Sequence, residues 1–217
     1  MSYITDRSEV KVCPNPGLTV TWCGWQKCYA GHEFGPSFYK DYAITFVLDG
    51  CGSYTLEGKT YQISQEMGFV IFPDKQISYV ADQNTPWEYV FSMFHGADVP
   101  TLLSSVGISA ENPVFQFENN EEIRDILDRM CQASKSSNHL GYDVVGFFYR
   151  AIALVAHKYA QRYHDMPLSE RYVSTALAYM EANYPYNISV QDVAGYVGVE
   201  RTYFYRLFKE QTGQSPQ

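Results

Sequence analysis

The feature that most constrains the fold is a change of period along the chain near Pro113. Before it, short apolar runs end in turns that contain glycine or proline. Beyond it, apolar residues return every third or fourth position. Runs such as Tyr42–Leu48 and Trp87–Phe94 have the length of strands, and regularly spaced strands with turn signals are typical of an antiparallel barrel or sandwich. The chain is therefore predicted to be α+β, with a β-barrel followed by helices.

Glycine-containing breaks mark the turns of this first part. Asp49–Gly52 follows the Tyr42–Leu48 run, and Glu57-Gly58 separates Ser53–Leu56 from Thr60–Ile63. Glycine readily adopts the positive φ that two-residue hairpin turns require. Each break therefore predicts a hairpin between the strands on either side of it.

The helical part opens with two longer segments. A first helix is predicted after Asn119, because Glu122 follows it at the spacing of a capping box. A second helix is predicted from Gly141 to Tyr163, and it is apolar on most of its circumference. Such a helix must be covered on most sides, either by the barrel or by another copy of the chain. Residues 114–165 are therefore expected to form a helical linker and dimerisation region, and a homodimer is expected.

After a linker at Asp165–Ser169, the sequence predicts three shorter helices. The first ends before Pro185, the second runs from the capping box Ser189–Asp192 to Gly198, and the third spans Arg201–Thr212. Their apolar faces are predicted at Val173, Ala176, Leu177 and Met180, at Val190, Val193, Ala194 and Val197, and at Phe204, Leu207 and Phe208. A short capped helix, a glycine and a polar-faced helix form the helix-turn-helix pattern.

Charge at first argues against a nucleic-acid partner. The net charge is −8 and the pI about 5.1, whereas nucleic-acid-binding proteins usually present a basic face. Residues 166–217, however, hold four basic and five acidic side chains, a net charge of only −1, so the rest of the chain carries −7. No apolar stretch of about 18 residues occurs, and the N-terminus has no signal-peptide pattern. A cytoplasmic protein is therefore expected.

The C-terminal motifs resemble the first helix-turn-helix of the AraC/XylS family of bacterial transcription regulators. The matching segments are Ile188–Ala194, Val197–Val199, Tyr203–Lys209 and Thr212–Pro216. This resemblance implies that residues 166–217 are the first half of a two-part DNA-binding domain. Because family members carry two such units and the sequence ends at Gln217, the second unit is expected to be absent, and weak DNA binding is expected.

The N-terminal part resembles the cupin-type, jelly-roll barrel of sugar-metabolism regulators in the same family. The matching segments are Gly31–Pro36, Gly50–Gly52, Gly58–Tyr61, Gly68–Pro73 and Pro86–Tyr89. The resemblance implies that residues 1–113 bind a small effector, expected to be a sugar. Relatives often carry an arginine shortly after the Gly-Pro motif, where this chain has Tyr39.

The last predicted helix supplies the expected DNA contacts. They are Arg201, Thr202, Tyr205, Arg206 and Lys209. The resemblance places Thr202, Tyr205 and Arg206 at base-reading positions. An arginine that pairs with guanine contributes roughly 1–3 kcal/mol of discrimination. Lys209 is expected to contact a phosphate. Glu200 stands where a Ser or Thr cap is usual, and it is expected to weaken the cap.

Six side chains of the barrel are expected to contact the effector. The resemblance suggests Tyr79, Tyr89 and Phe91, and position on the early strands adds Trp22, His32 and Tyr39. Tyr89 and Phe91 are two residues apart, so they share one face of a strand. Sugar sites combine aromatic faces with a few polar groups. The alternative for each aromatic side chain is that it fills the core.

A cupin-fold metal enzyme, a dioxygenase or isomerase, is the competing hypothesis. Such enzymes hold iron or manganese with a His-x-His pair, a glutamate and a later histidine. The five histidines form no such pair, and the five cysteines form no CxxC pair. Neither enzymatic activity nor a metal or other cofactor is therefore expected. A pure dimerisation module, the third alternative, would leave the helix-turn-helix unexplained.

Overall fold

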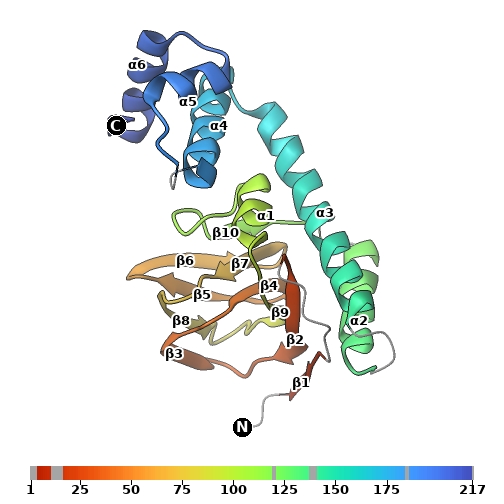
Figure 1. Ribbon diagram of the computed structural model, residues 1–217. Coiled ribbons are helices and arrows are strands. Elements are labelled where there is room, and N and C mark those ends of the chain that lie inside the picture. Colours follow the sequence, from red (N-terminus) through yellow and green to blue (C-terminus); the bar gives the residue numbers. More distant parts are fainter. Residues whose placement is uncertain (1–3, 11–16, 119–120, 137–140, 184–185, 217) are drawn as a thin grey trace.

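The computed structural model describes residues 4–10, 17–118, 121–136, 141–183 and 186–216. Two antiparallel sheets pack face to face in the N-terminal part (Figure 1). The long helix α3 (Tyr142–Asp165) runs from beside these sheets to a unit of three helices at the other end of the molecule. The predicted α+β architecture, with a cupin-like sandwich and a C-terminal helix-turn-helix, is confirmed.

The larger sheet has six strands and the smaller one has four. In spatial order the larger sheet contains β1 (Ile4–Glu9), β2 (Thr19–Lys27), β9 (Glu88–His95), β4 (Tyr42–Asp49), β7 (Met67–Ile71) and β10 (Val114–Gln116). The smaller sheet contains β3 (Glu33–Phe38), β8 (Gln76–Ala81), β5 (Cys51–Leu56) and β6 (Lys59–Ser64).

One of the two predicted hairpins is confirmed and the other is wrong. β5 and β6 pair across Glu57-Gly58, and both of these residues have positive φ, 48° and 81°. The break at Asp49–Gly52 instead carries the chain from one sheet to the other, since β4 pairs with β7 and β9 while β5 pairs with β6 and β8. Gly50 is needed at this crossover, because a Cβ there would lie 2.5 Å from the carbonyl oxygen of Pro86.

Strand β4 is buried on both faces, which explains its nearly continuous apolar sequence. Ala43 and Val47 belong to the core between the two sheets. Ile44 and Phe46 belong to a second core, formed against the helices on the outer face of the larger sheet. Helix α2 (Glu121–Ser134) lies on this face beside α3 (Figure 1), and it buries the Ile123, Ile126, Leu127 and Met130 side chains predicted for it.

Two short elements were not predicted. Helix α1 (Val99–Ser105) follows β9, with Pro100 in its first turn. Strand β10 pairs with β7 and places Phe115 over Gly68, where a Cβ would lie 2.2 Å from the Phe115 ring. The sheet therefore continues past residue 113, the predicted boundary of the barrel. Asn119, the predicted helix cap, lies outside the described residues.

The C-terminal unit contains α4 (Leu168–Asn183), α5 (Val190–Val197) and α6 (Arg201–Thr212). Its core contains Val173, Ala176, Val193, Ala194, Phe204, Leu207 and Phe208. The predicted capping box is present, since Ser189 and Asp192 each accept a hydrogen bond from the other's backbone N–H. Leu177 was predicted to face inward, but it is 40% exposed and lies outside the core of the C-terminal unit. Pro185 lies outside the described residues.

No described helix is both long enough and apolar enough to cross a membrane.

Candidate effector cavity and DNA-reading helix

A cavity of about 400 Å³ lies inside the sandwich, between the two sheets. All six side chains predicted to contact an effector line it: Trp22, His32, Tyr39, Tyr79, Tyr89 and Phe91. The alternation of strands explains the convergence, because every second residue of β2 and β9 faces the smaller sheet. The structure thus brings these residues together around one space.

The cavity wall contains a hydrogen-bonded chain of three side chains. The Tyr89 hydroxyl donates to Gln26 Oε1 at 3.1 Å, and Gln26 Nε2 lies 3.3 Å from His32 Nε2. An amide nitrogen is only a donor, so His32 Nε2 accepts and the ring proton resides on Nδ1. Desolvation by burial lowers the pKa of His32. The imidazole is therefore neutral at pH 7.

Tyr39 and Tyr79 add two further hydroxyl groups to the cavity wall. Tyr79 stacks on Phe34 with ring centroids 4.9 Å apart, and its ring meets that of Tyr89 edge to face at 6.5 Å. Desolvation by burial raises the pKa of both Tyr79 and Tyr39. Both hydroxyls are therefore protonated at neutral pH, where each can donate or accept a hydrogen bond.

Several lining residues were missed by the sequence analysis. They are Thr5, Arg7, Gln26, Phe34, Ala43, Thr45, Phe69, Ile71 and Met93. Arg7 is notable because no arginine follows the Gly-Pro motif, and here the guanidinium comes from the edge strand β1 instead. The alternation of β1 was the available signal, since Thr5 and Arg7 are two residues apart. The alternation alone does not say which face of β1 meets the cavity; the pairing of β1 with β2 shows this.

A larger cavity of about 590 Å³ lies between the sandwich and the C-terminal unit. It is formed by the loop after α1 together with α3, α4 and α6, and its lining includes Glu111, Tyr159 and Glu170. None of the six predicted effector residues lines it. Because Tyr159 supplies its one aromatic ring among the described lining residues, this cavity suits a sugar less well than the one inside the sandwich.

The predicted DNA contacts all lie on the exposed face of α6. Arg201, Thr202, Tyr205, Arg206 and Lys209 are exposed, whereas Phe204, Leu207 and Phe208 are buried. The Arg206 guanidinium lies over the Tyr203 ring at 5.6 Å, and its Nε is 4.0 Å from Glu210. An exposed pair of this kind holds the side chain only weakly, so Arg206 is free to reorient toward a ligand.

The expectation that Glu200 weakens the start of α6 is wrong. Its carboxylate accepts a hydrogen bond from the Tyr203 backbone N–H at 3.1 Å. Hydrogen bonds from the backbone N–H groups of Thr202 and Tyr203 lower the pKa of Glu200. A carboxylate at a helix N-terminus also interacts favourably with the helix dipole. Glu200 therefore caps α6 in place of the usual Ser or Thr.

Within the described part of the chain, no group of three or more His, Cys, Asp or Glu side chains is arranged to hold a metal ion. Cys23, Cys28, Cys51 and Cys131 are free thiols, and Cys13 lies outside the described residues. Burial raises the pKa of Cys23 to about 12 and that of Cys28 to about 11. These two thiols are therefore protonated and poorly nucleophilic at neutral pH.

Comparison with known families agrees with this geometry. Residues 20–144, more than half of the chain, match the AraC-like ligand binding domain. Residues 180–217 match the bacterial regulatory helix-turn-helix proteins of the AraC family. The first match contains all six residues predicted to contact the effector, and the second contains all five predicted DNA contacts.

Three curated relatives are similar to most of the chain. The Msm operon regulatory protein of Streptococcus mutans is 24% identical, over 93% of this chain and 73% of its own length. The lactose operon transcription activator of Staphylococcus xylosus is 22% identical, over 89% of this chain and 71% of its own length. The raffinose operon transcriptional regulatory protein RafR of Pediococcus pentosaceus is 23% identical, over 96% of this chain and 78% of its own length.

Proposed function

The chain belongs to the AraC family of bacterial regulators, and from this premise we propose that it controls carbohydrate genes by binding a sugar between its sheets. It is a ligand-responsive, DNA-binding transcription regulator. The observation that carries the sugar-binding proposal is the convergence of Trp22, His32, Tyr39, Tyr79, Tyr89 and Phe91 on one cavity. We propose a binding protein of the cytoplasm rather than an enzyme.

The composition of the cavity supports a carbohydrate. Its volume of about 400 Å³ lies within the usual range for small-molecule sites, which combine apolar and aromatic walls with a few placed polar groups. Tyrosine and tryptophan faces cover the C–H patches of a sugar ring, while Gln26 and the tyrosine hydroxyls face its hydroxyl groups. Two of the three relatives are named for the lactose and raffinose operons, which also favours a sugar.

The three parts of the chain have separate roles in this proposal. The sandwich binds the effector, residues 114–165 dimerise, and residues 166–217 bind DNA. The outer face of α3 supports dimerisation, because Tyr142 and Tyr149 are 61% and 44% exposed there and a Cβ at Gly146 would meet open space. An effector changes DNA binding only if it favours one arrangement of these parts over another through differential contacts.

A matched pair of phenylalanine variants tests effector binding. Phe91 lines the cavity, whereas Phe38 is 63% exposed and lies outside it. Thermal unfolding is measured with pentoses, hexoses, α- and β-galactosides, uronates and sugar phosphates for the unmodified chain, Phe91→Ala and Phe38→Ala. A ligand that binds the folded state raises its melting temperature. We expect one sugar to do so for the unmodified chain and Phe38→Ala, but not for Phe91→Ala. Absence of any shift across the panel would refute sugar binding.

A further inference from the structure

The described residues that line the sandwich cavity contribute formal charge of one sign only, and it is positive. None of the described residues that line it is an aspartate or a glutamate, although the chain carries a net charge of −8. His32 is neutral, and the lining tyrosines keep their protons. The guanidinium of Arg7 is therefore the one formal charge that the described lining residues contribute at neutral pH.

Among the hydrogen-bonding groups of the wall, two side chains can only donate. Arg7 offers five N–H donors and no acceptor, and the indole of Trp22 offers one donor and no acceptor. The strongest neutral acceptor of the wall, Gln26 Oε1, already receives the proton of Tyr89. The other side-chain acceptors of the described lining are the hydroxyl oxygens of Thr5, Tyr39, Thr45 and Tyr79, and each of these hydroxyls can also donate. The cavity is thus rich in donors and complementary to a ligand that is rich in acceptors.

The pairing of β1 with β2 fixes the position of Arg7 in the cavity wall. In the β1·β2 ladder Arg7 is directly opposite Gly24. A Cβ at Gly24 would lie 2.8 Å from the Arg7 Cβ and 2.5 Å from the carbonyl oxygen of Asp6. Trp22 and Gln26, on either side of Gly24, both line the cavity. The missing side chain therefore lets β1 approach closely and opens the wall at the point where Arg7 stands.

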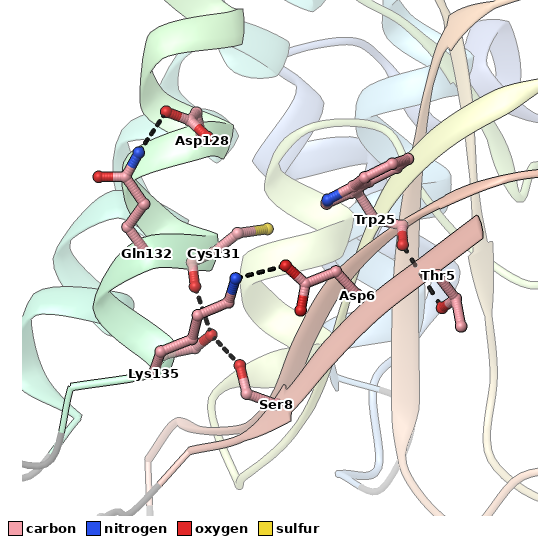
Figure 2. A network of polar contacts seen from close by, with 9 residues as sticks. Thr5, Asp6, Ser8, Trp25, Asp128, Cys131, Gln132 and Lys135 are labelled. Carbon is pink, nitrogen blue, oxygen red and sulfur yellow. Dashed lines mark hydrogen bonds and ion pairs between the residues drawn. The ribbon is translucent and has the colours of Figure 1, made fainter.

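Polar contacts connect the other face of β1 to the C-terminal end of α2. Figure 2 shows Asp6 and Ser8 directed toward the C-terminal turn of this helix, where Asp6 pairs with Lys135. The Ser8 hydroxyl lies 2.5 Å from that of Ser134, which is itself buried. Since alternate residues of a strand point to opposite faces, these contacts hold β1 while Thr5 and Arg7 face the cavity.

We propose that the effector is an anionic carbohydrate, and that Arg7 binds its carboxylate or phosphate group. This inference rests on the proposed function and specifies its ligand class. A guanidinium matches both oxyanions with two parallel hydrogen bonds, which a lysine ammonium cannot reproduce. The aromatic faces of the wall bind the ring, and Arg7 selects the charged derivative over the neutral parent.

The test compares each neutral sugar with its own acidic derivatives. Titration calorimetry on the full chain uses galactose, galacturonate and galactose 6-phosphate, and the corresponding glucose series, with inorganic phosphate as a further ligand. The variants are Arg7→Gln, Arg7→Lys and the control Lys75→Gln. Lys75 makes an exposed ion pair with Glu57 at 3.7 Å and does not line the cavity, so the control removes the same charge elsewhere on the sandwich.

We expect one anionic derivative to bind at least tenfold more tightly than its neutral parent. The uronate and phosphate arms identify which oxyanion is bound. In Arg7→Gln this ratio falls below about threefold, in Arg7→Lys it takes an intermediate value, and in Lys75→Gln it is unchanged. Circular dichroism verifies that each variant is folded.

The outcomes separate the inference from the function on which it rests. A neutral sugar that binds as tightly as its acidic derivatives, or more tightly, overturns the inference and leaves sugar binding intact. An anionic preference that survives in Arg7→Gln also overturns it. If inorganic phosphate binds as tightly as the sugar phosphate, the ring is not recognised, and both the inference and the sugar-binding proposal fail. Binding of no ligand in either series likewise refutes both.

Discussion

Gln26 and Tyr89 lie directly opposite each other in the β2·β9 ladder, and the tyrosine hydroxyl donates to the amide oxygen at 3.1 Å. This bond fixes which end of the Gln26 amide faces His32, because the oxygen is already engaged by Tyr89. The amide nitrogen then requires an acceptor at His32 Nε2, 3.3 Å away. A cross-strand pair thus sets the tautomer of a histidine in the cavity wall.

Tyr89→Phe should destabilise the chain and weaken effector binding. The substitution removes the donor to Gln26 while keeping the buried ring. Loss of one such bond lowers the free energy of unfolding by about 0.5–1.5 kcal/mol. Urea unfolding measures this change. Tyr61→Phe is the control, since its hydroxyl donates to the Glu111 carbonyl at 3.4 Å in an exposed position. Equal losses in both variants would contradict the role given to the Gln26–Tyr89 pair.

Stability should fall in mildly acidic solution because of His32. Its pKa is lowered in the folded chain by desolvation, so the unfolded chain binds the proton more readily. The free energy of unfolding is therefore highest above about pH 6.5, the ordinary histidine pKa. It decreases as the pH falls from there toward the lowered pKa of the folded chain. Protonation also removes the acceptor for Gln26 Nε2.

Urea unfolding between pH 5 and pH 8 checks this expectation, with His32→Gln as the comparison. The variant should show a flatter decline over this range, because the titrating group is gone. His95, which pairs with Asp41 at 3.4 Å on the surface, remains in both proteins and so cancels from the difference. Parallel profiles for the two proteins would contradict the assignment to His32.

Local sequence patterns predicted most of the fold because they reflect local physics. The capping box at Ser189 and the helix Arg201–Thr212 were predicted correctly, since caps and helical periods are complete within a few residues. The break at Asp49–Gly52 was misinterpreted because a glycine turn looks the same whether the chain reverses within a sheet or crosses to another. Only the long-range pairing of β4 with β9 distinguishes the two cases.

The cavity was predicted in part for the same reason. Tyr89 and Phe91 were expected in the wall from the family resemblance, and their spacing of two residues places them on one face of a strand. Arg7 has no such signal and looks like an ordinary residue of an edge strand. Its place in the wall depends on the β1·β2 ladder and on the close approach at Gly24. Glu200 was misjudged because cap preferences are averages, and its carboxylate reaches the Tyr203 N–H as a serine would.

Gly24→Ala should displace β1 without changing any side chain of the cavity. The new Cβ would lie 2.5 Å from the Asp6 carbonyl oxygen, which is backbone and cannot rotate away. Overpacking of this kind costs about 1–3 kcal/mol. Hydrogen exchange should therefore become faster for the amides of β1, and effector affinity should fall together with it.

The control is Gly195→Ala on α5, where a Cβ meets open space. There the substitution should stabilise the helix by about 0.5–1 kcal/mol and leave exchange in β1 unchanged. If Gly24→Ala exchanges as slowly in β1 as the unmodified chain, the close approach of the two strands is not what holds Arg7 in place.

Substitutions on α6 should separate base reading from phosphate binding. Arg206→Ala removes a side chain that can pair with guanine, which lowers affinity for a preferred sequence by about 1–3 kcal/mol and relaxes that preference. Lys209→Ala should weaken binding to all sequences alike and reduce the salt slope by about 1. Arg129→Ala on α2 is the control, because Arg129 is also largely exposed and pairs only with Asp125 in the same helix among the described contacts.

The measurement uses fluorescence anisotropy on duplexes that the unmodified chain selects from a random library. Low salt is required, because residues 166–217 carry a net charge of −1 and gain little from counterion release. Arg206→Ala must lose discrimination between selected and scrambled duplexes, while Lys209→Ala must lose affinity for both in proportion. Were Arg206→Ala to behave like Arg129→Ala, the exposed face of α6 would not be the surface that reads bases.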